Sequence, residues 1–332
     1  MRAVVLVGGF GTRLRPLTNS VPKPMLPIGH RPMIARLVDR LARGGVTEVV
    51  LALGFRPEPF IEAFPDGRCG DVTLTYAVEP EPLDTGGAIR FAADVAGIDD
   101  TFVVANGDVM TDLDVGALVA AHRGFGAEAT LHLIAVDDPS AFGVVDLATD
   151  GRISAFVEKP APGTEPSNLI NAGTYVFEPS VLARIAPSTK VSIERETFQR
   201  VVADGALFGF ATDDYWIDAG RPELYRAANL DLLNGVRRFD RCDAVSPTAS
   251  VAADATVRNS VIGDHAVVSA GATVIDSVLL PHARVGHGAS VERSLVMGSV
   301  GVDSRIADCM IGADGAVLDG AALVGVAIPE PS

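Results

Sequence analysis

The chain has 332 residues, which is enough for two domains with sizeable hydrophobic cores. Its formal net charge of −15 and its pI of about 4.8 make nucleic acids and anionic membrane surfaces unfavourable partners. The three cysteines are far apart in the sequence, so we expect no disulfide framework, no zinc site and a cytoplasmic location. No stretch approaches the ~18 apolar residues of a membrane span, and we expect no membrane partner.

The first part of the chain alternates predicted strands with predicted helices. The strands are expected at residues 3–7, 48–53, 72–78 and 101–105, and the helices at residues 32–43 and 85–96. This alternation predicts a mostly parallel sheet with helices on both faces, which is a Rossmann-like α/β fold. Ligands bind beyond the carboxyl ends of the strands in such sheets, and both Gly8 and Asp108 follow a predicted strand closely.

From residue 127 the pattern changes to strands that are separated by loops. These strands are expected at residues 127–136, 142–147, 153–158 and 170–177, and helices are expected at residues 194–203 and 222–233. We expect the added strands to lie over the edge of the parallel sheet and to form one wall of a cleft.

Aliphatic residues recur at every sixth position after about residue 241. The repeats restart 17 residues apart, at Val245, Ile262, Leu279 and Val296. This hexapeptide spacing predicts a three-sided parallel β-helix of about five coils, whereas a β-sandwich would show alternation at every second residue. The register shortens after Val296, which predicts one irregular coil. The domain boundaries are therefore expected at residues 1–238 and 239–332.

A glycine-rich segment follows the first predicted strand. Residues 8–18 read GGFGTRLRPLT, and residues 22–27 read PKPMLP. Glycines let backbone N–H groups approach an anion closely, and Arg13 and Lys23 add positive charge. The Walker A pattern is absent, and the prolines predict an ordered loop where a dinucleotide fingerprint requires a helix. The segment therefore predicts a phosphate site.

The complete string from GGFGTRLRPLT to PKPMLP resembles the signature of the sugar-1-phosphate nucleotidyltransferases, also called NDP-sugar pyrophosphorylases. The resemblance implies a nucleotidyltransferase domain and a left-handed β-helix. It also implies Mg²⁺-dependent transfer of a nucleotidyl group from a nucleoside triphosphate to a sugar 1-phosphate, with release of pyrophosphate. The runs SIERETF and YWIDAGRPELY resemble those of mannose-1-phosphate guanylyltransferases, which favours GTP and mannose 1-phosphate.

Several alternatives stay open at this point. The acceptor is also compatible with a heptose, glucose or cyclitol 1-phosphate, and another triphosphate is compatible with the motifs. A hexapeptide acyltransferase that uses His265, His282 or His287 and a non-catalytic sugar-nucleotide-binding regulator are the alternatives from other classes. Such β-helices commonly pair, so we expect a homo-oligomer, with a dimer favoured.

The resemblance also implies the roles of individual residues. The triphosphate is expected to contact Leu6, Gly8, Gly9, Gly11, Thr12, Arg13, Lys23, Leu83, Asp84, Thr85, Gly86, Asn106 and Gly107, with Arg13 and Lys23 as catalytic charges. The sugar phosphate is expected to contact Gly143, Glu158, Lys159 and Asn171, and Asp108 and Asp218 are expected to hold Mg²⁺.

Each of these residues also has a structural interpretation. A single aspartate is more often a cap or a solvated carboxylate, and Glu158-Lys159 is compatible with a solvated pair at a strand end. Lysine occurs only three times in the chain, which favours a function for Lys23 and Lys159. Asp84 stands where the family usually has glycine, and either it reads a guanine base or it caps the following helix.

Overall fold

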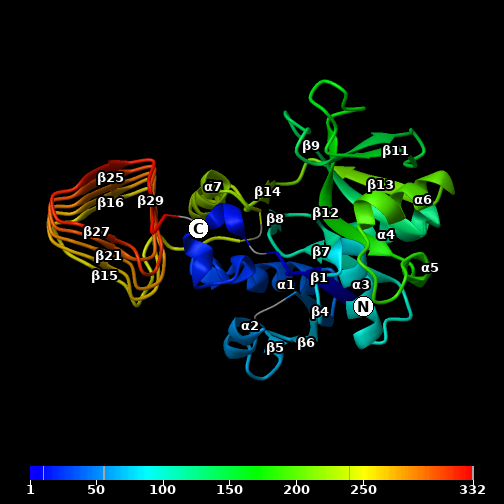
Figure 1. Cartoon of the computed structure of the whole chain (residues 1–332), viewed down its shortest axis with the longest axis horizontal. Helices are drawn as coiled ribbons and strands as arrows, with labels where there is room; N and C mark the ends of the chain where they lie inside the picture. Colours follow the sequence, from blue (N-terminus) through cyan, green and yellow to red (C-terminus); the bar gives the residue numbers. More distant parts are fainter. Residues whose placement is uncertain (10, 55–56, 239, 331–332) are drawn as a thin grey trace. The chain divides into compact units, whose positions relative to one another are not determined.

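The computed structural model describes residues 1–9, 11–54, 57–238 and 240–330. By its internal contacts the chain forms two compact units. We call residues 1–9 with 34–216 the sheet unit, and residues 10–33 with 217–332 the β-helix unit (Figure 1). The boundary at residue 238 was placed from the sequence pattern and stays a prediction.

A mixed sheet forms the centre of the sheet unit. Its strands are β1 (Arg2–Leu6), β4 (Glu48–Leu53), β5 (Arg68–Cys69), β6 (Val72–Val78), β7 (Phe102–Asn106), β9 (Ala129–Ala135), β10 (Gly143–Leu147), β11 (Ile153–Glu158), β12 (Leu169–Phe177) and β13 (Leu207–Thr212). The order along the sheet is β11-β10-β12-β7-β1-β4-β6-β5, and β9 pairs with β12 and β13. The four central strands β7, β1, β4 and β6 are parallel, as the alternating sequence pattern predicted.

The strands after residue 127 are mostly antiparallel to their neighbours, and they extend the sheet beyond β7. β12 pairs antiparallel with both β7 and β9, and β10 pairs antiparallel with β11. β13 returns parallel to β9. The apolar core contains Val4, Val50, Val104 and Leu131, all with no exposed surface. The predicted mixed, mainly parallel sheet is confirmed.

The remaining elements outside the β-helix are short strands and helices. The short strands are β2 (Pro27–Ile28), β3 (Arg31–Pro32), β8 (Val109–Thr111) and β14 (Trp216–Asp218), and the helices are α1 (Met33–Arg43), α2 (Glu58–Ala63), α3 (Asp84–Val95), α4 (Val115–Phe125), α5 (Pro179–Ala183), α6 (Phe198–Ala203) and α7 (Pro222–Leu233). No helix in the described part of the chain is both long and apolar enough to cross a membrane.

The helix predicted at residues 194–203 is interrupted. Its first part is a π-helical turn, η4 (Ile193–Thr197), and α6 follows it directly. The Ser192 hydroxyl accepts the N–H of Arg195 at 3.2 Å, and the Ser192 N–H donates to the Glu196 carboxylate at 3.1 Å. These local contacts fix the wide first turn, and such turns frequently occur at functional sites.

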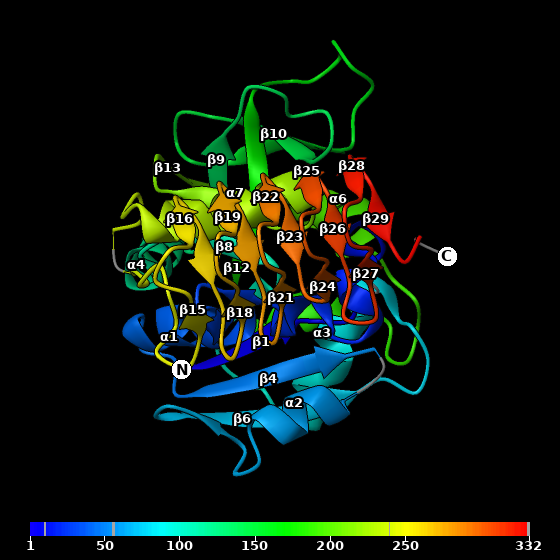
Figure 2. The same cartoon turned by 90° about the vertical axis from the view of Figure 1, so that its left-hand side faces the viewer.

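The second unit contains a parallel β-helix of five coils. Its three five-stranded sheets are ordered β15-β18-β21-β24-β27, β16-β19-β22-β25-β28 and β17-β20-β23-β26-β29, and Figure 2 shows the strands stacked coil upon coil. The strands are β15 (Ser250–Val251), β16 (Thr256–Arg258), β17 (Val261–Ile262), β18 (Val267–Val268), β19 (Thr273–Ile275), β20 (Val278–Leu279), β21 (Arg284–Val285), β22 (Ser290–Glu292), β23 (Leu295–Val296), β24 (Ser299–Val300), β25 (Arg305–Ala307), β26 (Met310–Ile311), β27 (Ala316–Val317), β28 (Ala322–Val324) and β29 (Ala327–Ile328).

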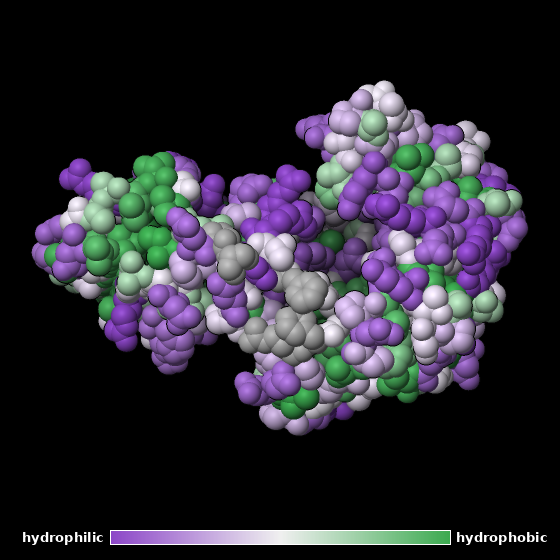
Figure 3. Space-filling view, in the orientation of Figure 1, coloured by the Kyte–Doolittle hydropathy of each residue, from purple (hydrophilic) through white to green (hydrophobic). Residues whose placement is uncertain are grey.

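One stacked aliphatic residue per face fills the core of the β-helix. Val268, Val285 and Val300 follow one another in one sheet, and each is at most 2% exposed. The predicted left-handed β-helix architecture with about five coils is confirmed. Figure 3 shows that part of its outer surface is also apolar, and the large apolar side chains most exposed on the β-helix are Leu318 and Val324.

The predicted irregular coil lies at one corner of the β-helix. Only Met297 and Gly298 separate β23 from β24, whereas four residues, 280–283, separate β20 from β21. A Cβ on Gly298 would lie 2.1 Å from the carbonyl oxygen of Gly315, so the short corner requires glycine. The change of register in the sequence therefore corresponds to a shortened corner.

Candidate active site

In the sheet unit, the carboxyl ends of β1 and β7 lie side by side. Leu6 is in register with Asn106, and the Gly107 N–H donates to the Leu6 carbonyl oxygen at 2.9 Å. A Cβ on Gly107 would lie 2.7 Å from Cγ1 of Val7, so only glycine allows this close approach. A Cβ on Gly8 would lie 3.3 Å from the backbone nitrogen of Gly54, a less severe contact. Hence the first two glycines and the Asn106-Gly107-Asp108 turn share one edge of the sheet.

The segment that precedes and begins α3 is tied down by side chains. Glu79 is 7% exposed and accepts the N–H of Leu83 at 2.9 Å. Burial raises the pKa of Glu79, and this hydrogen bond opposes the rise. The N–H of Gly86 donates to the Val191 carbonyl oxygen at 2.8 Å. Among the expected nucleotide-binding residues, Leu83 is therefore held by Glu79 and Gly86 by Val191, and the sequence patterns indicated neither contact.

Asp84 has an unusual backbone for a residue with a side chain. Its φ is 60°, in the left-handed region that glycine adopts at least cost. Its carboxylate accepts the N–H of Thr85 at 2.8 Å, whereas Leu83 occupies the N-cap position of α3. Asp84 is thus the first residue of α3, where the cap interpretation expected it to precede the helix, and its exposed carboxylate bonds only the next backbone N–H among the described residues.

Glu158 and Lys159 lie at the end of β11, opposite Gly143 on β10. A Cβ on Gly143 would lie 2.9 Å from Oε2 of Glu158, so glycine leaves room for this carboxylate. Nζ of Lys159 lies 3.7 Å from Oε1 of Glu158, and the lysine side chain is 60% exposed. Burial raises the pKa of Glu158, the charge of Glu194 raises it further, and Lys159 partly opposes the rise.

Asn171 lies on β12, beside an irregularity in its pairing with β9 between Asn171 and Tyr175. Its Nδ2 donates to the Tyr175 hydroxyl at 3.0 Å, and its Oδ1 accepts the N–H of Gly173 at 3.1 Å. Burial raises the pKa of Tyr175, and the charges of Glu194, Glu158 and Asp108 raise it further. Carboxylates of the expected sugar and metal sites therefore act on the Tyr175 hydroxyl through their charge.

In the β-helix unit, the rest of the glycine segment forms an ordered loop with three short 3-10 turns, η1 (Thr12–Leu14), η2 (Leu17–Asn19) and η3 (Lys23–Met25). Gly11 has a φ of 60°, and its carbonyl oxygen accepts the Thr18 hydroxyl at 2.9 Å. The loop predicted from the prolines is confirmed, and the left-handed backbone explains the glycine at position 11.

Arg13, Lys23 and Asp218 converge on Gly220. A Cβ on Gly220 would lie 2.7 Å from Oδ1 of Asp218, 2.9 Å from Nη2 of Arg13 and 3.2 Å from Nζ of Lys23. Nη2 of Arg13 lies 4.0 Å from Oδ2 of Asp218. Three residues that are far apart in the sequence thus present two cations and one carboxylate at a single place.

The carboxylates Asp108 and Asp218 offer oxygen ligands to a metal ion. No group of three or more His, Cys, Asp or Glu side chains in the described ranges is arranged to hold a metal ion. A divalent cation at Asp218 or Asp108 would therefore take its remaining ligands from phosphate oxygens and water, which is the usual arrangement for Mg²⁺. The oxygen donors that these residues offer fit such an ion.

The histidines of the β-helix lie at corners. His265 and His282 have φ values of 56° and 66°, and their rings stack with centroids 5.2 Å apart. Both side chains are exposed, and neither ring forms a hydrogen bond with another described residue. These turn positions do not favour the acyltransferase alternative.

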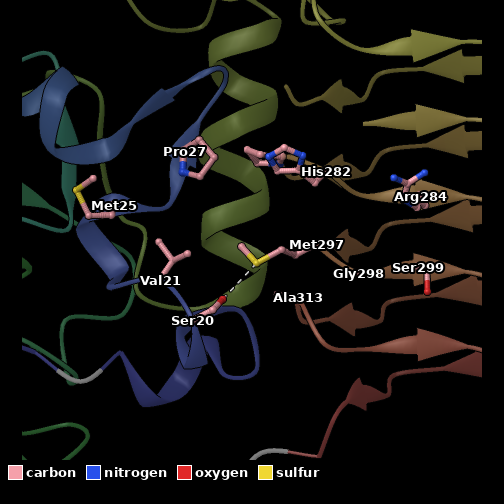
Figure 4. A pocket seen from close by; sticks show the side chains of 11 residues that line it. Ser20, Val21, Met25, Pro27, His282, Arg284, Met297, Gly298, Ser299 and Ala313 are labelled. Carbon is pink, nitrogen blue, oxygen red and sulfur yellow. Dashed lines mark hydrogen bonds between the residues drawn. The ribbon is translucent and has the colours of Figure 1, made fainter. Parts of the chain in front are cut away.

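A cavity of about 540 Å³ lies between residues 20–27, the part of the ordered loop that carries Lys23, and the corners of the β-helix (Figure 4). The Ser20 hydroxyl contacts Sδ of Met297 at 3.7 Å, at the shortened corner. The lining consists of Ser20, Val21, Met25, Pro27, Pro281, His282, Arg284, Met297, Gly298, Ser299 and Ala313. The loop that carries Lys23 thus packs against the β-helix.

Two family models match the chain. The model described as nucleotidyl transferase matches residues 2–235, and the model described as GlmU-like, C-terminal hexapeptide matches residues 235–322.

Known proteins similar to this chain include two enzymes named for the same reaction. The mannose-1-phosphate guanylyltransferase of Mycobacterium tuberculosis is 44% identical over 238 residues, which cover 70% of this chain and 65% of that protein. The mannose-1-phosphate guanyltransferase of Schizosaccharomyces pombe is 41% identical over 254 residues, 75% of this chain and 69% of that protein. The matched part of this chain spans about two thirds of the length of these relatives.

Solved structures give a consistent result for the nucleotidyltransferase part. A putative glucose-1-phosphate thymidylyltransferase from Bacillus anthracis matches with a TM-score of 0.63 and 27% identity, covering 69% of this chain and 94% of that one. HddC from Yersinia pseudotuberculosis, complexed with GMP-PN, matches with a TM-score of 0.59 and 30% identity, covering 69% and 97%.

Proposed function

Because this chain belongs to the nucleotidyl transferase family, we propose that it transfers a guanylyl group from GTP to mannose 1-phosphate and releases pyrophosphate. The observation that carries the proposal is the convergence of Arg13, Lys23 and Asp218 on Gly220, because a polyphosphate requires such clustered cations. The names of the two relatives at 44% and 41% identity support guanine as the base and mannose 1-phosphate as the acceptor.

The proposed reaction needs no nucleophile or general base from the protein. The phosphate of a sugar 1-phosphate is already an anion, and it attacks the α-phosphorus of GTP. A bond forms between that phosphorus and the phosphate oxygen, and the bond to the β-phosphate breaks to release pyrophosphate. Catalysis then depends on positioning and on neutralising phosphate charge, which we assign to Arg13 and Lys23.

We assign the acceptor to the group around Glu158. The Lys159 ammonium is largely exposed, so it is available to the sugar phosphate, and the carboxylate of Glu158 accepts hydrogen bonds from sugar hydroxyls. Gly143 keeps the space beside that carboxylate open, and Asn171 is held in place by the Tyr175 hydroxyl. These contacts support the roles proposed for the four residues.

The family implies a divalent metal, and we propose Mg²⁺ held by Asp108 and Asp218. When bound, such an ion neutralises charge on the reacting phosphates and orients them. Asp218 Oδ1 accepts the Gly220 N–H at 2.9 Å, which fixes the orientation of this carboxylate. Removal of metal with EDTA should abolish pyrophosphate release, and Mg²⁺ should restore it.

The organisation of the whole protein is also a proposal. We propose that the catalytic domain ends near residue 238 and that the protein is a cytoplasmic homo-oligomer, with a dimer favoured. None of the three cysteines, all within the described residues, forms a disulfide, which suits a reducing compartment. The apolar side chains Leu318 and Val324 are exposed on the β-helix.

The decisive experiment is a pyrophosphate-release screen of five nucleoside triphosphates against a panel of sugar and cyclitol 1-phosphates. We expect the highest kcat/KM for GTP with mannose 1-phosphate. A different preferred pair would correct the substrates, and nucleotide binding without any pyrophosphate release would favour the regulator alternative.

Lys23→Ala tests the catalytic assignment. It should lower kcat by a factor of about 100 or more, because the lost charge stabilises the transition state. Lys190→Ala is the matched control, since Lys190 is exposed and lies outside the motifs. Near-normal turnover by the Lys23 variant would refute its proposed role.

A further inference from the structure

Glu194 is a partly buried carboxylate to which the sequence patterns assigned no role. It lies on the π-helical turn η4, and its Oε2 accepts two hydroxyl groups, that of Thr85 at 2.7 Å and that of Ser192 at 3.0 Å. The Thr85 hydroxyl in turn accepts the N–H of Ile193 at 2.9 Å. The carboxylate is thus fixed between the start of α3 and the π turn.

Hydrogen bonds attach this turn to the strand that carries Glu158. Nε2 of Gln199 donates to the carbonyl oxygen of Phe156 on β11 at 3.0 Å and to that of Glu194 at 3.2 Å. The charge of Glu194 acts on Glu158 and on the Tyr175 hydroxyl. The two carboxylates therefore lie in the same part of the sheet unit, close to the Asn171–Tyr175 pair.

Two neighbouring carboxylates that are both partly buried repel each other, and each loses hydration. Glu194 forms no ion pair with any Lys, Arg or His of the described chain, and Oε1 has no hydrogen-bond partner there. A ligand rich in O–H donors and free of negative charge on that side satisfies both carboxylates. The hydroxyls of a sugar ring meet this requirement.

We propose that Glu194 determines acceptor specificity, with its Oε1 accepting a hydrogen bond from one ring hydroxyl of the sugar 1-phosphate while Glu158 accepts from a different hydroxyl. The proposal rests on the proposed function, because it assigns a second sugar contact to the same site. It restricts the acceptor to sugars or cyclitols with free hydroxyls at two separate ring positions.

Glu194→Gln separates this contact from the structural ones. The remaining amide oxygen still accepts from Thr85 and Ser192, whereas the NH₂ group replaces the free acceptor with a donor. Glu196→Gln is the matched control, because Glu196 lies on the same turn and is exposed. Within the described part of the chain, its Oε1 accepts the Ser192 backbone N–H and no other hydrogen bond.

The test measures kcat/KM of the full-length protein for mannose 1-phosphate and its single-deoxy analogues, with GTP at saturation. Wild type should lose about 10- to 100-fold with the analogues that lack either recognised hydroxyl. With mannose 1-phosphate itself, the kcat/KM of Glu194→Gln should be about 10- to 100-fold below that of wild type. Its kcat/KM should fall no further with the analogue that lacks the hydroxyl recognised by Glu194. Glu158→Gln should likewise show no further loss of kcat/KM with one analogue, but this analogue should lack a different hydroxyl. KM for GTP should be unchanged in both variants.

The outcomes separate the inference from the proposed function. If Glu194→Gln keeps the wild-type ranking of all the analogues, or behaves like Glu196→Gln, Glu194 does not contact the sugar. If both glutamate variants lose sensitivity to the same hydroxyl, the division of contacts is wrong. A wild-type protein that transfers to none of the sugar 1-phosphates would instead refute the proposed function itself.

Discussion

At the scale of single residues, Asp84 combines a backbone that favours glycine with an exposed carboxylate. A side chain at φ 60° costs about 1 kcal/mol, and its hydrogen bond to the Thr85 N–H offsets part of this cost. Guanine presents two adjacent donors, its ring N–H and its amino group, which a carboxylate matches. The structure places Leu83 at the N-cap of α3, so the Asp84 carboxylate stabilises the helix start only through the Thr85 N–H, and base reading stays a prediction.

Asp84→Gly distinguishes these two interpretations. If the carboxylate reads guanine, the variant should lose about 1–3 kcal/mol of its preference for GTP over ATP without loss of ATP use. Its free energy of unfolding should change by no more than about 1 kcal/mol, because the glycine backbone gain opposes the lost hydrogen bond. An unchanged ratio of kcat/KM values would show that the Asp84 carboxylate does not read the base.

Glu158 is expected to reduce stability at neutral pH. Its pKa is raised by burial and by Glu194, so the folded protein holds this proton to higher pH than the unfolded chain does. The stability that the protonated Glu158 gives the folded state is therefore fully present below the ordinary glutamate pKa. It is lost as pH rises through the raised pKa of the folded state. Glu158→Gln should unfold at higher urea than wild type at pH 8, and the difference should vanish near pH 4.5. Glu62→Gln, at an exposed position, should show no such pH-dependent gain.

At the scale of elements, the bounds of strands and helices could be predicted best where burial alone determines them. The strands at 48–53, 72–78 and 153–158 and the helix at 222–233 have the observed bounds, because continuous or periodic aliphatic runs specify them. The helix α4 was not predicted, although Asp114 at its N-cap and Gly126 at its end are recognisable signals.

The residues of the candidate site could be predicted only in part, because some of their contacts depend on how distant segments pack together. The residues in contiguous motifs, such as Lys23 and Glu158, could be identified from the family signature. Glu79 and Glu194 stand outside those assignments, and the Thr85–Glu194 contact joins residues 109 positions apart. Such contacts depend on tertiary packing, which sequence periodicity does not reveal. The predicted helix at 194–203 differs for a local reason, because the Ser192 contacts fix a π turn ahead of α6.

His132 on β9 is expected to make the stability of the fold sensitive to acid. His132 is fully buried, and Nε2 lies 2.9 Å from the Thr212 hydroxyl. Burial, with a smaller effect from Arg40, lowers its pKa to about 3. A depressed histidine pKa contributes stability above the unfolded value near 6.5, and this stability is lost as pH falls toward the folded value.

Chemical denaturation at several pH values tests this effect. The free energy of unfolding should fall by about 1.4 kcal/mol for each pH unit between 6 and 4 on account of His132. His132→Gln should be less stable at pH 7 but should lose less stability on acidification. The exposed His287→Gln should retain the wild-type slope, and an identical slope in both variants would remove His132 as the cause.

At the scale of the whole molecule, the β-helix supports the loop that carries Lys23. The Ser20 hydroxyl contacts Met297, and Nε2 of His30 lies 2.8 Å from the carbonyl oxygen of Asp243. Pro16 lies so close to Gly312 that a Cβ on this glycine would be 2.8 Å from Cβ of Pro16. The hexapeptide repeats therefore have a structural link to the proposed chemistry besides any role in assembly.

Gly312→Val in the full-length chain tests this support directly. The added side chain must displace Pro16, and a displaced loop should lower kcat by about 10- to 100-fold, because charge neutralisation depends on the position of Arg13 and Lys23. The five-coil stack should remain folded, which far-UV circular dichroism and the unfolding midpoint would show. Ala322→Val is the control, since it adds a β-branched residue at an exposed strand position of the same β-helix. Wild-type kcat in the Gly312 variant, with an intact fold, would show that the β-helix does not position the catalytic loop.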